Sequence, residues 1–192
     1  MNRIFCLLGK TGAGKDTLFN SVISDPDIDI SPVITCTTRP RRVDEIDGIN
    51  YRFMTEEEMN RLEAEGGILE RRTYSTVNGL WHYFTAVSAI PKNGDSIIIT
   101  TPAALKMLSA KMCASWTDRI VAVMLETDAR VRLLRSIERE SREAAPNYAE
   151  VCRRFYSDEA DFKDFDIKYY NHFIIDANLC NAECLAQFKQ NL

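Results

Sequence analysis

The feature that most constrains this chain is a glycine-rich loop that follows a short apolar run at its N-terminus. Residues 4–8 are apolar and predict a buried strand, and a loop from Gly9 to Gly14 comes next. Lys15 then opens a segment whose apolar positions, among them Leu18 and Val22, recur at helical spacing. A strand, a GxxxxGK loop and a helix in this order are the pattern of a P-loop. Its glycines let main-chain N–H groups and the helix N-terminus approach a phosphate chain.

This loop predicts binding of a nucleoside triphosphate. The residues expected to hold it are Gly9, Thr11, Gly12, Ala13, Gly14, Lys15, Asp16 and Thr17. Asp16 stands where the signature has Ser or Thr, and a carboxylate is a hard-oxygen ligand for Mg²⁺. We therefore expect Asp16 to face the metal, directly or through water, and Thr17 to reach an inner phosphate. The alternative is a glycine-rich turn that only joins a strand to a helix.

Composition narrows the remaining classes of protein. With 192 residues the chain can form one domain with a small insert, and a formal charge of −4 argues against a nucleic-acid partner. No apolar run approaches the roughly 20 residues that span a bilayer, so we expect no membrane association. The chain starts directly with a strand, so we expect no signal or transit peptide. Six scattered cysteines without a metal-site pattern suggest free thiols in a reducing cytoplasm.

Residues 31–90 are expected to form a small β-rich insert. A strand is predicted over 32–37, and the Thr55–Glu58 spacing predicts a helical capping box. Two further strands, over 68–74 and 81–85, are joined through a turn at Asn78-Gly79, a strong hairpin signal.

The remaining segments, 1–30 and 91–192, are expected to form the core. Apolar runs at 96–100, 120–125 and 173–175 alternate with helical patterns, which predicts an α/β fold with a parallel sheet covered on both faces. A helix is expected to begin at Pro102 and a last helix to close the chain. Its apolar positions are Leu179, Leu185 and Phe188.

Two charged helices are expected between 127 and 164, with a break near Pro146. Each helix has an apolar stripe. The stripe of the first helix consists of Val131, Leu134 and Ile137. The stripe of the second consists of Tyr148, Val151, Cys152, Phe155 and Phe162. Most of the many arginines here are expected to form a solvated face with neighbouring glutamates. One or two can instead swing over the P-loop as guanidinium clamps, with residues 127–155 acting as a lid.

Three blocks behind the loop make the chain resemble the guanylate kinase family. They are residues 33–42 (VITCTTRPRR), 47–53 (DGINYRF) and 66–70 (GGILE). The resemblance implies a P-loop kinase core, a nucleoside-monophosphate-binding insert over 31–90 and a helical lid. It implies that ATP phosphorylates GMP, with Mg²⁺ as the metal. It also implies that Arg39, Arg42, Tyr51 and Tyr83 hold the GMP phosphate, while Glu70, Thr35 and Thr85 read the base.

The residue types fit those implied roles. Guanine presents the adjacent donors N1–H and N2–H₂, and the carboxylate of Glu70 can accept both, whereas adenine would leave it mispaired. The alternative for Glu70 is an exposed strand carboxylate that pairs with Arg72. Tyr74 is an alternative to Tyr83, because the hairpin departs from the family pattern.

Phosphoryl transfer would need alignment and charge neutralisation rather than a protein base, because the acceptor is already an anion. The residues expected to act are Lys15, Arg42, Arg139 and Arg154, with Arg135 and Arg153 as alternates. The strand at 96–100 leads into Thr100 and Thr101, where the family has aspartates. A kinase for another nucleoside monophosphate, or a non-catalytic module, therefore stays open, and the oligomeric state is not predicted.

Overall fold

The computed structural model describes residues 2–41, 45–76, 79–111 and 119–192 of the chain. Within these residues five strands form one parallel sheet in the order β2-β7-β1-β8-β9. The strands are β1 (Ile4–Leu8), β2 (Ile30–Pro32), β7 (Asp95–Ile99), β8 (Ile120–Glu126) and β9 (Asn171–Asp176). The predicted α/β fold with a parallel sheet is confirmed.

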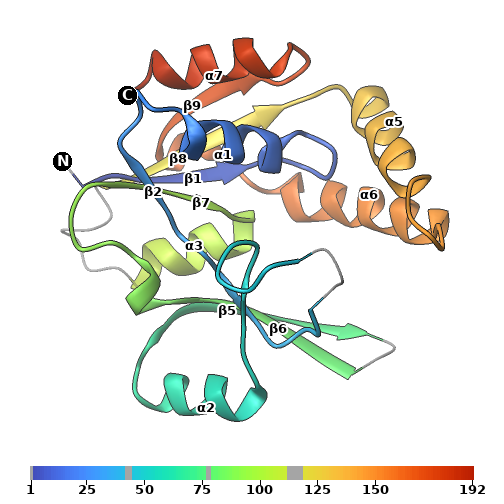
Figure 1. The fold of residues 1–192 in the computed structure, drawn as a ribbon. Helices are drawn as coiled ribbons and strands as arrows, with labels where there is room; N and C mark the ends of the chain where they lie inside the picture. Colours follow the sequence, from blue (N-terminus) through green and yellow to red (C-terminus); the bar gives the residue numbers. More distant parts are fainter. Residues whose placement is uncertain (1, 42–44, 77–78, 112–118) are drawn as a thin grey trace.

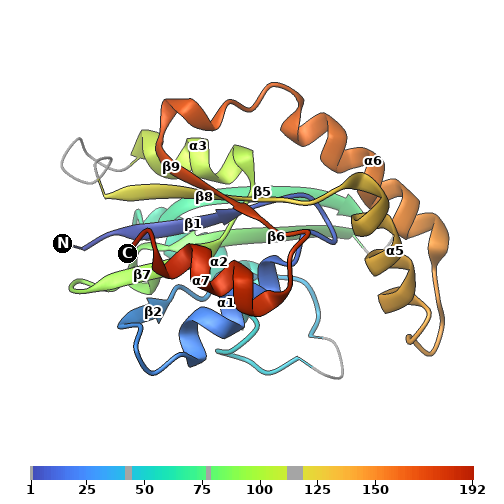
Figure 2. The same ribbon diagram turned by 90° about the horizontal axis from the view of Figure 1, so that it is seen from above.

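Helices cover both faces of this sheet, and the central strand β1 is therefore buried on both of its faces. Phe5 and Leu7 pack on one side against α1 (Lys15–Ser24) and α7 (Asn181–Lys189). Cys6 and Leu8 pack on the other side against α3 (Pro102–Lys111) and α6 (Tyr148–Lys163). Figure 1 shows α1 and α7 above the sheet and α3 below it, and Figure 2 shows the same layers from above. A continuous apolar strand is what burial on both faces requires.

A second sheet lies beyond α3, in the order β4-β3-β6-β5. Its strands are β3 (Cys36–Thr37), β4 (Arg52–Phe53), β5 (Ile68–Thr76) and β6 (Gly79–Ala86). The predicted hairpin is β5 and β6, although Asn78 of its turn lies outside the described residues. Helix α2 (Glu56–Ala64) covers the sheet and begins with the predicted capping box, in which the Glu58 N–H donates to Thr55 Oγ1.

The strand predicted over 32–37 is wrong as a single element. Its first residue ends β2 in the parallel sheet, and Cys36 and Thr37 form β3 in the second sheet. Pro32 has no N–H and stands at the end of an edge strand, where that loss breaks no pairing with an inner strand. The chain therefore crosses between the sheets at the point where an unbroken strand was expected.

The apolar stripe predicted for the first charged helix is also wrong. In α5 (Ala129–Glu140) Leu134 is 55% exposed and Ile137 39% exposed, whereas Arg132 and Ser136 are buried. The helix therefore turns a polar face towards the P-loop. In α6, Val151 is buried as expected, but Tyr148 and Cys152 are exposed.

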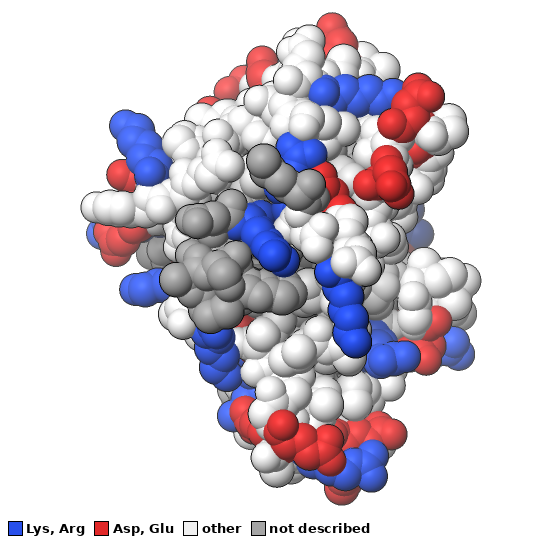
Figure 3. Space-filling view, turned by 90° about the vertical axis from the view of Figure 1, so that its left-hand side faces the viewer, with Lys and Arg blue, Asp and Glu red and all other residues white. Residues whose placement is uncertain are grey.

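Two short 3₁₀ segments, η1 (Val87–Ala89) and η2 (Ile167–Tyr169), complete the connections. Every cysteine among the described residues is a free thiol. In the described part of the chain, no helix is long and apolar enough to cross a membrane. On the face shown in Figure 3, Lys and Arg side chains are spaced apart and share the surface with Asp and Glu.

The aromatic cluster under α7 provides a test of this packing. Phe188 is fully buried, and its ring lies 5.3 Å from that of Phe5 and 5.8 Å from that of Phe173. Phe188→Ala is expected to lower the free energy of unfolding by about 3–5 kcal/mol, because it removes a fully buried aromatic side chain. Tyr169→Ala, at an 86% exposed position, is the control and should change little. Equal effects in denaturant titrations would contradict this packing.

Candidate functional site

The P-loop joins the carboxyl end of β1 to α1. Gly12 has a φ of +79°, and a Cβ added there would lie 2.4 Å from the carbonyl oxygen of Arg132. A side chain is therefore excluded here by both backbone strain and the main chain of α5. Gly14 caps α1 in the left-handed conformation, with φ 95°, and Lys15 begins the helix. The first N–H groups of α1 consequently face the loop.

Lys15 places its ammonium group inside this loop. Its Nζ donates to the carbonyl oxygen of Gly9 at 2.6 Å and to that of Lys10 at 3.4 Å. Burial lowers the pKa of Lys15, and the nearby carboxylates of Asp16 and Asp158 oppose that shift. A largely buried cation that donates to these carbonyl oxygens favours a negatively charged ligand beside it.

Two carboxylates of α6 already lie on the loop. Asp158 accepts a hydrogen bond from the Thr11 N–H. Glu159 pairs with Lys10 and accepts from Nη2 of Arg132 at 2.9 Å. A carboxylate on a P-loop N–H stands in for a phosphate oxygen. A triphosphate that uses the Thr11 N–H must therefore displace the Asp158 side chain.

Arg132 is the functional candidate that the sequence did not single out. It is only 4% exposed, and its guanidinium lies 4.6 Å from the centre of the Phe155 ring. Among the described residues no partner accepts from its buried Nη1. The seven arginines in this stretch look alike in sequence, so only the orientation of α5 shows which of them turns inward. Asp158 and Glu159 were missed for a similar reason, because the sequence does not show which carboxylates of α6 face the loop.

An open cavity of about 790 Å³ lies beside the loop at the carboxyl ends of β8 and β9. Its walls include Lys10 and Arg132 together with the apolar side chains of Phe162 on α6 and of Phe165 just after that helix. The volume falls within the usual range of small-molecule sites. The cavity therefore offers room for the part of a nucleotide that the loop does not hold.

In the second sheet, Arg39 brings together several residues predicted to hold a monophosphate. Its Nε donates to the Tyr83 hydroxyl at 3.1 Å, and its Nη atoms donate to Glu45 at 3.0 and 2.6 Å. The Tyr83 ring lies 5.7 Å from that of Tyr51 and 5.6 Å from that of Tyr74. The two alternatives Tyr83 and Tyr74 are therefore neighbours.

The charges of this group reach the P-loop. Burial acts to lower the pKa of Arg39, but its bonds to Glu45 and Tyr83 outweigh that effect and raise it. Burial raises the pKa of Tyr51, and Tyr83 and Asp16 raise it further. The negative charge of Asp16 in α1 therefore acts on a residue predicted to hold the monophosphate.

Of the two alternatives for Glu70, the exposed carboxylate paired with Arg72 is right about the partner and wrong about the exposure, and base reading stays a prediction. Glu70 pairs with Arg72, with Nε to Oε2 at 3.1 Å, but it is 2% exposed rather than solvated. Its Oε1 accepts from Thr85 Oγ1 at 2.8 Å. Nη1 of Arg72 donates to Thr101 Oγ1 at 3.4 Å, just beyond the end of β7. A carboxylate is thus buried and oriented at the interface of the two sheets.

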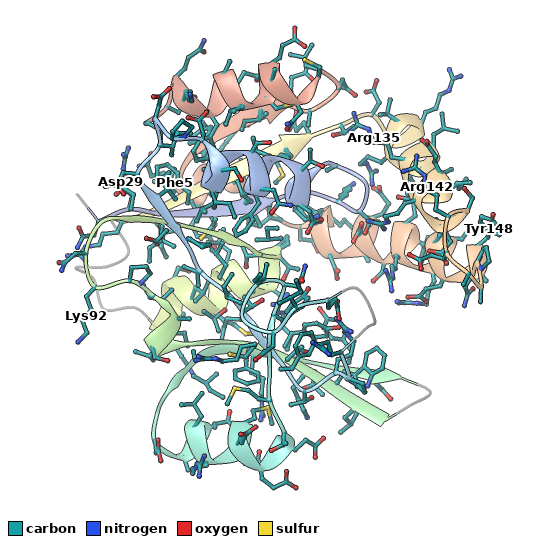
Figure 4. All side chains as sticks on the ribbon, in the orientation of Figure 1. Phe5, Asp29, Lys92, Arg135, Arg142 and Tyr148 are labelled. Carbon is teal, nitrogen blue, oxygen red and sulfur yellow. The ribbon has the colours of Figure 1, made fainter. Side chains whose placement is uncertain are left out.

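The predicted lid arginines lie on α5 and α6, and the two on α6 share an acidic partner. Glu150 accepts from Nε of Arg153 and from Nε of Arg154, each at 2.7 Å. These contacts, that of Arg153 first, lower the pKa of Glu150 to about 2. Arg139 is exposed on α5, and Arg135, labelled in Figure 4, donates to the Ala177 carbonyl at 3.2 Å. No lid arginine is aligned on the loop by a hydrogen bond that the described residues make.

The remaining predicted residues are less informative. Arg42 lies outside the described residues. Thr35 is half-buried, and its carbonyl accepts from the Arg52 N–H at 2.9 Å. Asp16 and Thr17 are exposed in the first turn of α1. Within the described ranges no three His, Cys, Asp or Glu side chains gather as a metal site, so a metal here would take few protein ligands.

Together, the sheet and the loop define an α/β protein with a P-loop at the carboxyl end of a central parallel strand. Residues 1–176 match the family model described as guanylate kinase. The chain belongs to the guanylate kinase family.

Relatives of known name share parts of the sequence. A guanylate kinase of Streptococcus mutans is 41% identical over 66 residues, which are 34% of this chain and 31% of that protein. A guanylate kinase of Bifidobacterium longum is 36% identical over 92 residues, which are 47% of this chain and 44% of that protein. The chain thus spans less than half the length of these relatives. The crystal structure of guanylate kinase from Anaplasma phagocytophilum has the same fold, with a TM-score of 0.66 at 15% identity over 99% of this chain and 84% of that one.

The contact between α6 and the loop generates a prediction. Asp158→Asn is expected to tighten ATP binding by about tenfold, because a neutral amide competes less well for the Thr11 N–H and repels no phosphate. Asp161→Asn, at an exposed position on the same helix, is the charge-matched control. Dissociation constants of the three proteins for ATP with Mg²⁺ provide the measurement. Equal or weaker binding by the Asp158 variant alone would contradict this contact.

Proposed function

We propose that this protein transfers the γ-phosphoryl group of ATP to GMP, giving ADP and GDP. The observation that carries the proposal is the buried carboxylate of Glu70, oriented by Thr85 and Arg72 across from a P-loop. A buried acceptor pair of this kind suits the adjacent N1–H and N2–H₂ donors of guanine. Family membership supports the same activity.

ATP would occupy the P-loop. Main-chain N–H groups from Gly9 to Gly14 would hold the phosphates, and Lys15 would contact the outer ones. Thr17 would face an inner phosphate, and the cavity beside Lys10 would take the nucleoside. Asp16 is the residue that would hold Mg²⁺, which keeps several waters and needs only one or two carboxylates. When bound, the ion would neutralise phosphate charge.

GMP would lie against the second sheet. Arg39, Tyr51 and Tyr83 would hold its phosphate, with Arg42 as a fourth contact predicted from sequence. Arg39 would then exchange Glu45 for the incoming dianion, as the Thr11 N–H would exchange Asp158 for a phosphate of ATP. Thr85 holds Glu70 in place, and Thr35 would complete the base pocket.

Catalysis would come from alignment and charge neutralisation. The acceptor oxygen of GMP is already anionic, so no protein group has to remove a proton. Lys15 and Arg42 would neutralise the transferring group from within the core and insert. Arg139 and Arg154 would join from the lid, and Arg154 would leave Glu150 to do so. Closure would also exclude water that could otherwise hydrolyse ATP.

A second candidate is a kinase for another nucleoside monophosphate. The observation that favours it is Thr101, which stands where the family has an aspartate and contacts Arg72 instead of offering a second carboxylate. A non-catalytic module is disfavoured, because this chain has both the glycine loop and Lys15 at the start of α1.

A panel of acceptors separates these candidates. We expect ADP formation from ATP with GMP and dGMP but little with AMP, CMP or UMP. Efficient turnover of AMP would favour the second candidate, and a folded protein that binds ATP but phosphorylates none of them would favour the module.

Glu70→Gln tests the base-reading role. The amide NH₂ would face a guanine donor, so kcat/KM for GMP should fall by a factor on the order of 10² or more while ATP binding is unchanged. Glu65→Gln, on the exposed end of α2, is the matched control. An unchanged kcat/KM for GMP in the Glu70 variant would contradict the role.

A further inference from the structure

Arg72 pairs with Glu70, the carboxylate proposed to read the base, and has no role of its own in the proposed reaction. We propose that Arg72 is a second specificity-determining residue, which donates a hydrogen bond to O6 of guanine while Glu70 accepts from N1–H and N2–H₂. The inference rests on the proposed function, because it assigns a further contact to the same base.

The hairpin register places Arg72 on the correct face. Residues 70 and 72 are two apart on β5, and Glu70 and Arg72 lie opposite Thr85 and Tyr83 on β6. Side chains at a spacing of two share one face of a strand. Arg71 points to the other face, where it pairs with Glu63 of α2 at 2.7 Å. Two adjacent arginines therefore have different surroundings, and of these two Arg72 is the one beside Glu70.

The contacts of Arg72 leave it able to bind a ligand. Its side chain is 16% exposed, and only one of its three bonds is short, Nε to Oε2 of Glu70 at 3.1 Å. Nη2 to Oε1 of Glu70 is 3.5 Å and Nη1 to Thr101 is 3.4 Å. A guanidinium has five N–H donors, and bonds near 3.5 Å are weak. The Nη atoms can therefore turn to a base oxygen at small cost.

The pair of charges complements the edge of guanine. That edge presents one acceptor, O6, followed by two donors, N1–H and N2–H₂. A guanidinium beside a carboxylate offers the complementary pattern, with a donor opposite O6 and acceptor oxygens opposite the two donors. Adenine presents N6–H₂ where Arg72 donates and N1 where Glu70 accepts, so both residues reject it. Hypoxanthine shares the 6-oxo group of guanine and lacks only its 2-amino group. Discrimination between these two bases therefore falls to Glu70, which reads the 2-amino group, while Arg72 reads the 6-oxo group.

The surroundings of Arg72 place it close to the other substrate candidates. Its charge acts on Tyr51 and lowers the pKa of that phenol, against the larger effect of burial. Its contact with Thr101 joins the second sheet to the loop that precedes α3, where Thr101 Oγ1 also accepts from the Ala104 N–H at 3.3 Å. Arg72 thus lies between the hairpin and the core.

The test compares GMP with 6-thio-GMP, in which a weaker acceptor replaces O6. Dissociation constants are measured by calorimetry for the wild type, Arg72→Met and the control Arg71→Met. We expect the wild type and the control to bind GMP roughly tenfold more tightly than 6-thio-GMP, as expected for one hydrogen bond to a charged donor. In Arg72→Met this ratio should approach one, and GMP binding should weaken by a similar factor.

Other outcomes overturn the inference in distinguishable ways. If Arg72 acts only by holding Glu70, GMP binding weakens in the variant but the ratio between the two nucleotides stays the same. A ratio of one in the wild type shows that O6 is not read. If the wild type does not bind GMP, the proposed function fails together with the inference. Arg72→Lys, which keeps a charge but a single donor centre, serves if the methionine variant does not fold, and it should reduce the ratio in part.

Discussion

A charge that is removed from water needs a partner, and this structure withdraws several charged groups from water at the P-loop and in the second sheet. Lys15 is held by loop carbonyls, Arg39 by Glu45 and Tyr83, and Glu70 by Thr85 and Arg72. Arg132 keeps one buried nitrogen that no described residue accepts from. Burying charges costs more than their pairing usually returns, so an arrangement of this kind is better explained by binding than by stability. A dianionic nucleotide and a triphosphate would complete it.

The internal partners resemble the ligands they would give way to. Asp158 accepts a hydrogen bond from a main-chain N–H of the P-loop, and Glu45 accepts one from the guanidinium of Arg39. Each carboxylate satisfies a donor that phosphate would otherwise satisfy. The affinity of each nucleotide is then a difference between two bonds to the same donor. Exchange of this kind also ties binding to movement of α6 and of the loop that carries Glu45.

Much of the fold could be predicted from the sequence. The parallel sheet, the hairpin, the Thr55 cap and the helix at Pro102 all follow from patterns that depend on neighbouring residues. The errors have a common cause, which is that burial is decided by distant parts of the chain. Pro32 ends an edge strand because the chain crosses to a second sheet there. Leu134 stays exposed because the P-loop, packed against the main chain of Arg132, orients α5.

The site was predictable where its chemistry is written in a short motif, as in the glycine loop and the GGILE block. It was not predictable where contacts come from the middle of uniformly charged helices. Glu70 shows both limits: its buried position follows from the hairpin, but the sequence alone could not say whether Arg72 competes with a base or assists in reading it. The role of each remaining candidate stays a prediction.

A crystal structure with GMP and a non-hydrolysable ATP analogue tests the central claim most directly. The account predicts guanine N1 and N2 within about 3 Å of the Glu70 carboxylate, and phosphate oxygens on the P-loop in place of Asp158. A guanine bound elsewhere, with Glu70 still held only by Arg72 and Thr85, would contradict it.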